Sequence, residues 1–228
     1  MKKSVSFILF LVMILLSLSS CTIADQGLKS WKTEDNGCVV SAGLATDLSR
    51  IIIPYFIDGS LVVGIDKDAF TLCYDLKTVF IPSSVKYIGP RAFCGCRRLK
   101  DITLPASLET IGEEAFAGCY AIKELEIPKG VSRIEEKCFS GCSSLERVSL
   151  PDNLSYIGEK AFYNCESLGE IYIPEGVGYI GKCAFAECEK LEKIIFGGSS
   201  EQWEEIMSIH DYSFDDNYYR NIEIIFEK

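Results

Sequence analysis

The chain has little histidine: only His210 occurs among its 228 residues. Catalytic systems of the Ser-His-Asp or Cys-His type use a histidine as general base, so this residue is their one candidate. His210 stands beside Asp211 and Tyr212 near the C-terminus, where an exposed cap turn is the simpler interpretation. The sequence also lacks a phosphate-binding loop and a metalloprotease motif. We therefore expect no catalytic residue, no metal site and no cofactor.

Basic residues are also fewer than acidic ones: the chain has 23 Lys and Arg and 33 Asp and Glu, which gives a formal net charge of -10. Binding to a phosphate backbone needs clustered Lys and Arg, so nucleic acid is excluded as a partner. Most of the acidic residues occupy exposed positions of the repeat described below, as on a solvated face. A carbohydrate-active enzyme built from paired carboxylates remains a less favoured alternative.

Long apolar runs are absent except at the N-terminus, where Lys2 and Lys3 precede an uncharged run from Val5 to Leu16. A membrane-spanning helix needs roughly 20 apolar residues, so this shorter run predicts a cleaved export signal. The following Leu18-Ser19-Ser20-Cys21 resembles the lipobox of bacterial lipoproteins. That resemblance implies a signal peptide over residues 1–20 and lipidation of Cys21. The alternative is an ordinary secretory signal with an incidental cysteine; both take the protein out of the cytoplasm.

A period of 23 residues runs through the rest of the chain. Phenylalanine recurs at this step at Phe70, Phe93, Phe116, Phe139, Phe162 and Phe185. Cysteine recurs at Cys73, Cys96, Cys119, Cys142, Cys165 and Cys188. Proline recurs at Pro82, Pro105, Pro128, Pro151 and Pro174. So many coincidences at one spacing indicate a repeated structural unit.

The repeated unit reads L-x-x-I-x-I-P-x-x-V-x-x-I-G-x-x-A-F-x-x-C-x-x-L. Its I-x-I step predicts a short strand that ends at the proline. The V-x-x-I step leads to a turn at the glycine, and A-F-x-x-C-x-x-L is typical of an irregular or one-turn helical return. Because one unit carries apolar residues on a single side, successive units must stack to bury them. The pattern thus predicts a solenoid.

This pattern of repeated residues resembles that of the BspA-like leucine-rich repeats, and the resemblance runs from about Ile53 to Trp203. Glu135 in place of the glycine and Cys138 in place of the alanine depart from the pattern. The resemblance implies a right-handed β/α leucine-rich-repeat solenoid with short strands and terminal caps, and a role in adhesion or host interaction.

The predicted domains follow from these boundaries. They are a signal peptide at 1–20, a lipidated tether with an N-terminal cap at 21–50, leucine-rich repeats at 51–203 and a C-terminal cap at 204–228. Near the C-terminus we also expect a helix from Glu201 to Ile209 and a last strand from Ile222 to Phe226.

Eleven cysteines in an exported protein would ordinarily indicate disulfides. Six of them share one repeat position beside core residues, which favours a ladder of buried free thiols instead. Besides Cys21, the others are Cys38, Cys94, Cys138 and Cys183, at unlike positions that force no disulfide pairing. Cys94 and Cys96 do not make a zinc site, because zinc takes about four ligands and the only histidine is distant.

Exposed strand positions are the natural place for a ligand, since strands roughly 5 Å apart turn each repeat position into a row on one concave surface. The first row is Thr78, Asp101, Glu124, Arg147, Glu170 and Lys193; the second is Phe80, Thr103, Glu126, Ser149, Tyr172 and Ile195; the third is Tyr87, Thr110, Arg133, Tyr156 and Tyr179. The candidate contact residues are Phe80, Tyr87, Arg147, Tyr156, Tyr172 and Tyr179. Tyrosine is enriched at binding hot spots, which favours Tyr156, Tyr172 and Tyr179; the alternative is that these rings only shield neighbouring repeats.

Together these features predict a membrane-anchored lipoprotein at the outer membrane or cell surface. Its expected partner is a protein or glycan, such as one of a host. A structural envelope component without a specific ligand is the alternative.

Overall fold

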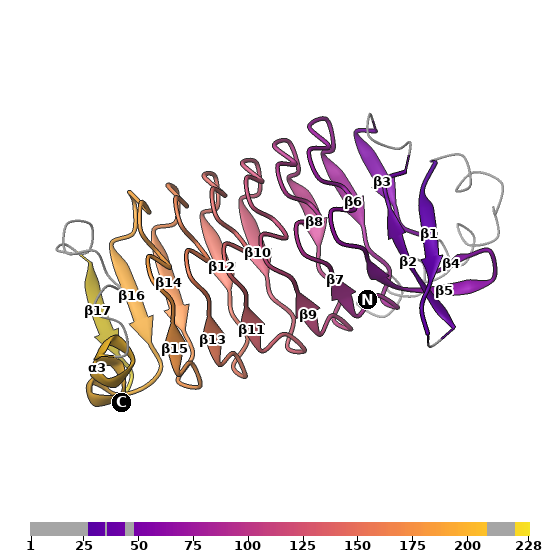
Figure 1. The fold of residues 1–228 in the computed structure, drawn as a ribbon. Helices are drawn as coiled ribbons and strands as arrows, with labels where there is room; N and C mark the ends of the chain where they lie inside the picture. Colours follow the sequence, from indigo (N-terminus) through magenta and orange to yellow (C-terminus); the bar gives the residue numbers. More distant parts are fainter. Residues whose placement is uncertain (1–26, 35, 44–47, 209–221) are drawn as a thin grey trace, which may run out of the picture.

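The protein is a solenoid of about seven turns with a spacing of 23 residues and little helix (Figure 1). The computed structural model describes residues 27–34, 36–43, 48–208 and 222–228. The predicted signal peptide, Cys21, His210 and Ile209 lie outside these residues. The prediction of a leucine-rich-repeat solenoid is confirmed.

The I-x-I steps form a first series of short parallel strands, whose repeats follow one another at 23 residues, as in Thr78 with Asp101. At the two ends the step is longer, as in Arg50 with Thr78 and Lys193 with Glu223. The series comprises β3 (Arg50–Ile52), β6 (Thr78–Phe80), β8 (Asp101–Thr103), β10 (Glu124–Glu126), β12 (Arg147–Ser149), β14 (Glu170–Ile173), β16 (Lys193–Phe196) and β17 (Glu223–Phe226). Alternation places Val79 in the core and Phe80 in solvent. Each repeat strand from β6 to β14 stops at its proline, whose carbonyl closes a turn, as in the bond from Val85 N to Pro82 O at 3.1 Å.

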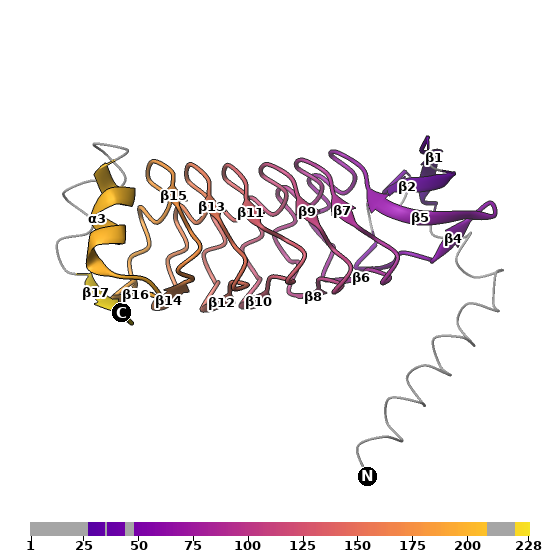
Figure 2. The ribbon, with the colours of Figure 1, turned by 90° about the horizontal axis from the view of Figure 1, so that it is seen from below.

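The V-x-x-I steps form a second series of strands, which the sequence pattern did not indicate. It comprises β5 (Ser60–Ile65), β7 (Tyr87–Ile88), β9 (Thr110–Ile111), β11 (Arg133–Ile134), β13 (Tyr156–Ile157) and β15 (Tyr179–Ile180). Proline removes only its own N–H from pairing. After the turn that follows the proline, the backbone again forms hydrogen bonds with the preceding repeat, as in Gly89 N to Ile65 O at 2.8 Å. Figure 2 shows the two series along opposite sides of the coil.

The returning A-F-x-x-C-x-x-L segments are successions of tight turns rather than helix. Within one return, Cys96 N donates to Phe93 O at 3.1 Å and Leu99 N donates to Cys96 O at 3.0 Å. Between turns, Phe93 N donates to Ala115 O at 2.8 Å. The returns thus bond to one another along the solenoid.

Close stacking of the turns favours the glycine of the I-G step. A Cβ on Gly89 would lie 2.6 Å from the backbone nitrogen of Lys67, and one on Gly158 would lie 2.7 Å from that of Glu136. Glu135 occupies this position in one turn, and the rings of Phe116 and Phe139 there are 5.6 Å apart, the widest step of the phenylalanine stack.

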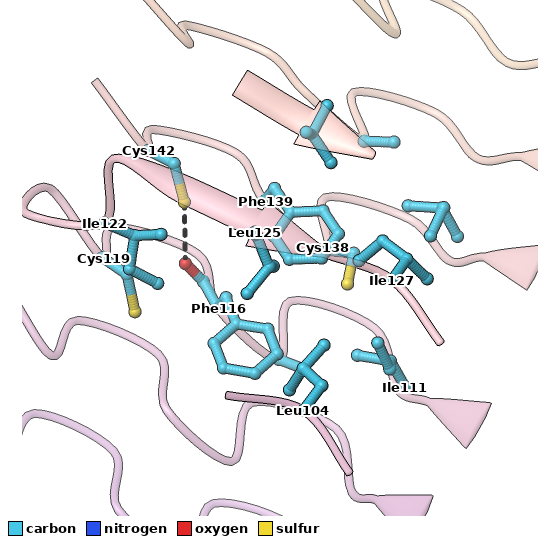
Figure 3. Packing of buried hydrophobic residues seen from close by; sticks show 14 of the residues in the cluster. Leu104, Ile111, Phe116, Cys119, Ile122, Leu125, Ile127, Cys138, Phe139 and Cys142 are labelled. Atoms are coloured by element: carbon cyan, nitrogen blue, oxygen red, sulfur yellow. Dashed lines mark hydrogen bonds between the residues drawn. The ribbon is translucent and has the colours of Figure 1, made fainter. Parts of the chain in front are cut away.

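The core is a stack of the repeated phenylalanines, with ring centroids 5.2 to 5.6 Å apart and rings within 16° of parallel. The repeated cysteines lie beside this stack. From Cys96 to Cys188 each thiol donates to the carbonyl of a phenylalanine of the preceding turn, at 3.0 to 3.4 Å. Figure 3 shows the bond from Cys142 to Phe116. The predicted ladder of buried free thiols is confirmed for the described residues.

The N-terminal end extends the second series. Strand β1 (Lys29–Lys32) pairs antiparallel with β2 (Gly37–Ser41), and β2 pairs parallel with β5. Strand β4 (Phe56–Ile57) folds back antiparallel on β5. The cap therefore begins as a strand hairpin that continues the coil.

The C-terminal end is covered by helix α3 (Ser200–Ser208), shown in Figure 2. Ser199 and Gln202 cap its start reciprocally: Ser199 N donates to Gln202 Oε1 at 2.8 Å, and Gln202 N donates to Ser199 Oγ at 3.3 Å. Trp203 is buried, with its ring 5.3 Å from that of Phe196. The helix and the last strand β17 are thus found within about one residue of their predicted starts. None of the described helices is long and apolar enough to span a membrane.

Candidate binding surface of the solenoid

The charged row of the first series is largely paired within itself. Arg147, a predicted contact residue, forms an ion pair with Glu124 of the neighbouring turn. Lys193 lies 3.6 Å from Glu170. Exposed ion pairs of this kind contribute little to stability, but a partner must compete with them to reach Arg147.

Phe80 and Tyr172 lie near opposite ends of the first series, with Thr103, Glu126 and Ser149 between them in the row. Phe80 is 47% exposed, and the guanidinium of Arg50 lies 4.8 Å from its ring centroid. The Tyr172 hydroxyl donates to a carboxylate oxygen of Glu227 at 3.2 Å. Burial, followed by this carboxylate, raises the pKa of Tyr172. The two aromatic residues therefore do not form one site.

The second series carries an aromatic stack near its C-terminal end. Tyr156 pairs with Tyr179 across β13 and β15, and their rings are 4.6 Å apart and within 4° of parallel. The guanidinium of Arg133 lies 3.7 Å from the ring centroid of Tyr156 and its Nε is 2.8 Å from Glu135 Oε1. Burial and the neighbouring Tyr156 raise the pKa of Tyr179. The stack presents mainly ring edges and hydroxyls, because Arg133 and the two rings cover one another's inner faces.

Strand register connects Tyr87, at the other end of this row, to the N-terminal cap. Tyr87 pairs with Gly64, Gly64 with Val39, and Val39 with Trp31. A Cβ on Gly64 would collide with the ring of Tyr87, so this ring lies over the glycine. Trp31 is 48% exposed. We call the following set the aromatic row: Trp31, Tyr87, Thr110, Arg133, Tyr156 and Tyr179; Gly64 and the buried Val39 lie between Trp31 and Tyr87. Sequence reasoning missed Trp31 because the cap lies outside the repeat period.

The expectation of one surface carrying all three rows is wrong. Phe80, Arg147 and Tyr172 belong to the first series, whereas Tyr87, Tyr156 and Tyr179 belong to the second (Figure 2). The proline turn between the two strands of each repeat redirects the chain, so their exposed positions face different sides. Tyr172 is therefore not grouped with Tyr156 and Tyr179.

A model of the BspA-type leucine-rich repeat region matches the chain with six copies, over residues 63–192 and 159–226. The chain belongs to the BspA-type leucine-rich-repeat family. It is similar to the solved leucine-rich-repeat protein of T. pallidum, at 32% identity and a TM-score of 0.70 over 77% of this chain and 85% of that one. It is also similar to a leucine-rich cell surface protein of Faecalibacterium prausnitzii, at 30% identity and a TM-score of 0.59. That match covers 75% of this chain and 53% of the other, so this chain spans about half of its length. No curated protein matches.

A shallow depression of about 240 Å³ lies at the C-terminal end of this BspA-type solenoid. It is lined by Glu175, Val177, Gly178, Gln202, Glu205 and Ile206, between the turn before β15 and helix α3. Gly178 directly precedes Tyr179, so the depression adjoins the aromatic row. Within the described ranges, no cluster of His, Cys, Asp or Glu is suited to hold a metal ion.

The thiols of this BspA-type protein differ in access. Cys94 and Cys183 are half-buried, whereas the repeated cysteines are buried. Burial raises the pKa of Cys142 to about 12 and also raises that of Cys94. The thiolate is the reactive form, so access and pKa together decide the rate of alkylation.

We therefore expect iodoacetamide at pH 8 to modify Cys94 and Cys183 in the folded protein before any of the repeated cysteines. The repeated cysteines are expected to react only after unfolding in denaturant. Mass spectrometry of peptides from a time course measures each site. Alkylation of Cys119 or Cys142 in the folded chain as fast as that of Cys183 contradicts the buried ladder.

Proposed function

We propose that this chain is a lipid-anchored protein of the cell envelope, exposed at the cell surface, that binds a protein or glycan as a non-enzymatic scaffold. The observation that carries the proposal is the aromatic row, whose strand pairing runs from Trp31 to Thr110 in one sheet and from Arg133 to Tyr179 in the next. Stacked strands hold such side chains at a step of roughly 5 Å. A set of tyrosine, tryptophan and arginine side chains distributed along the solenoid suits contact with an extended partner.

The second series is the better binding face for a reason of charge. Arg147 and Lys193 of the first series are engaged by carboxylates of neighbouring turns. The aromatic row instead offers phenol hydroxyls and apolar ring edges, which bind without first breaking an ion pair between turns. Tyrosine also orders at low entropic cost, since its side chain has few rotatable bonds.

Location outside the cytoplasm is supported by the apolar run and lipobox-like residues before Cys21. The related F. prausnitzii protein is described as a cell surface protein, which agrees with this location. An anchor at Cys21 attaches the chain by its N-terminal end, and the repeats then extend away from the membrane.

The binding part of the proposal is tested with a Tyr156→Ser/Tyr179→Ser double variant. The purified full-length chain is applied to arrays of glycans and of extracellular proteins, and the affinity for any array member bound is then measured. Loss of two hot-spot tyrosines is expected to weaken binding about tenfold or more. Tyr163→Ser is the matched control, because Tyr163 is half-buried on a return segment away from the row.

Thermal unfolding of each variant shows that the comparison is made between folded proteins. Binding that is unchanged in the double variant contradicts a role for the aromatic row. The absence of any bound array member favours a structural envelope component instead.

A further inference from the structure

The return segments carry an exposed apolar surface that belongs to neither strand series. It consists of Leu72, Tyr74, Arg97 and Tyr120, and we call it the return patch. Leu72, Tyr74 and Tyr120 are 52%, 46% and 44% exposed, and they are three of the eight exposed large hydrophobic residues of the described chain. Tyr74, Arg97 and Tyr120 share one repeat position in successive turns, so they are adjacent along the solenoid.

Arg97 is held by aromatic rings rather than by an acid. Its guanidinium carbon lies 4.9 Å from the ring centroid of Tyr74 and 5.8 Å from that of Tyr120. Among the described residues, no carboxylate lies within ion-pair distance of Arg97, whereas Arg98 pairs with Asp75 at 2.6 Å. A guanidinium that lies over rings keeps its in-plane N–H groups for a carboxylate, which they bind bidentately.

Leu72 is both exposed and strained. Its φ of +59° lies in the left-handed region, which is unfavourable for a bulky L-residue. The same position of the next three turns is Gly95, Gly118 and Gly141, and of the two after them Asn164 and Glu187, all with positive φ. An apolar side chain in this conformation, directed to solvent, serves neither the core nor the backbone. The repeat imposes this backbone conformation, but it does not require a leucine at this position.

The glycines leave the backbone accessible beside the patch. A Cβ on Gly95 would lie 2.7 Å from Leu72 Cδ2, so the leucine side chain lies against this glycine. Cβ atoms on Gly118 and Gly141 would each lie 3.8 Å from Tyr120 Cε1. Between Leu72 and Tyr120 no side chain projects from the glycine backbone, so the backbone of another molecule can approach it closely.

We propose that the return patch docks a peptide segment of another protein, one that presents an Asp or Glu carboxylate to Arg97 and an apolar side chain to Leu72. The exposed aliphatic Leu72 favours a peptide over an acidic glycan, because sugars are rich in hydroxyls and leave it poorly covered. Tyrosine and arginine are also the residues most enriched at protein-binding hot spots. The proposal shares the idea of a binding scaffold with the proposed function but uses no residue of the aromatic row, so each can fail without the other.

The test begins with a phage-displayed library of random 12-residue peptides, selected on the full-length chain. Enriched peptides are expected to combine Asp or Glu with Leu, Phe or Tyr. The dissociation constant of one enriched peptide is then measured for the wild type, Arg97→Gln and Tyr74→Ser/Tyr120→Ser. Both changes are expected to weaken binding about tenfold or more. Arg98→Gln is the matched control and should bind within about twofold of the wild type, since Arg98 is engaged by Asp75.

Leu72→Gly distinguishes a binding role from a structural one, because its effects on stability and on peptide affinity are expected to have opposite signs. Removing the left-handed leucine is expected to raise the melting temperature by about 2–4 °C while weakening the peptide severalfold. Enriched peptides that bind Arg97→Gln and Leu72→Gly as well as the wild type overturn the proposal. So does an array on which only acidic glycans bind in an Arg97-dependent manner, because the ligand is then a glycan. Failure to enrich any peptide overturns it as well.

Discussion

Raising the pH from 7 to 10 is expected to remove most of the stability of this protein. Burial raises the thiol pKa of Cys96, Cys119, Cys138, Cys142 and Cys165 in the folded state, with Cys142 reaching about 12. Below the unfolded pKa, near 9.0, both states keep these protons and the stability is present in full. Above it the unfolded chain loses protons while the folded chain retains them, so stability falls as pH rises toward the folded pKa values.

The expected magnitude follows from one proton per thiol. Each pH unit above the unfolded pKa costs about 1.4 kcal/mol for each buried thiol. Five thiols therefore cost on the order of 7 kcal/mol at pH 10, which is comparable to the whole stability of a typical domain. Urea unfolding followed by circular dichroism at pH 7, 8, 9 and 10 measures this loss.

A Cys119→Ala/Cys142→Ala variant separates the thiols from other groups that titrate in the same range. It begins less stable, because two buried sulfur atoms are lost, but its stability should fall less steeply between pH 9 and 10. A wild-type stability that is constant across this range, or a variant with the same slope, contradicts the account of the thiol ladder.

Phe139→Ala is expected to lower the free energy of unfolding by about 3–5 kcal/mol, the usual cost of deleting a buried phenyl ring. The ring of Phe139 is stacked between Phe116 and Phe162 at 5.6 and 5.4 Å, and the residue is 1% exposed. A repeat that loses its ring also weakens its interfaces with both neighbours, because each turn is stabilised by the adjacent turns. Chemical denaturation monitored by circular dichroism measures the change.

Phe80→Ala is the matched control, since Phe80 undergoes the same truncation on the exposed side of a strand. Its cost should be small, within about 0.5–1 kcal/mol, from the partial loss of its contact with Arg50. A Phe139→Ala cost below that of Phe80→Ala is incompatible with a core built on the phenylalanine stack.

The period of the sequence was sufficient to predict the core. Phe70 to Phe185 and Cys73 to Cys188 recur at a step of 23 residues, and a residue that returns to the same position in every turn must stack on itself. The terminal helix and strand were also predictable, because a solenoid exposes its core at each end unless a different segment covers it.

The second strand series was not predictable from the pattern, because its members from β7 to β15 have only two residues each and are defined by hydrogen bonds between turns. The division of the exposed rows depends on the direction in which the proline turn redirects the chain, which side-chain type does not specify. Trp31 joins the aromatic row only through the register of β1 with β2. The return patch was missed because Tyr74, Arg97 and Tyr120 stand at variable positions outside the strands.

The most direct test of the proposed function follows the chain on living bacterial cells. Cells expressing the wild type or Cys21→Ala are grown with a labelled fatty acid, treated intact with protease and analysed by immunoblot. The proposal predicts a wild type that is labelled and cut on whole cells, and a Cys21→Ala chain that is unlabelled and released. A labelled wild type that is protected from protease contradicts exposure at the cell surface, and an unlabelled wild type contradicts the lipid anchor itself.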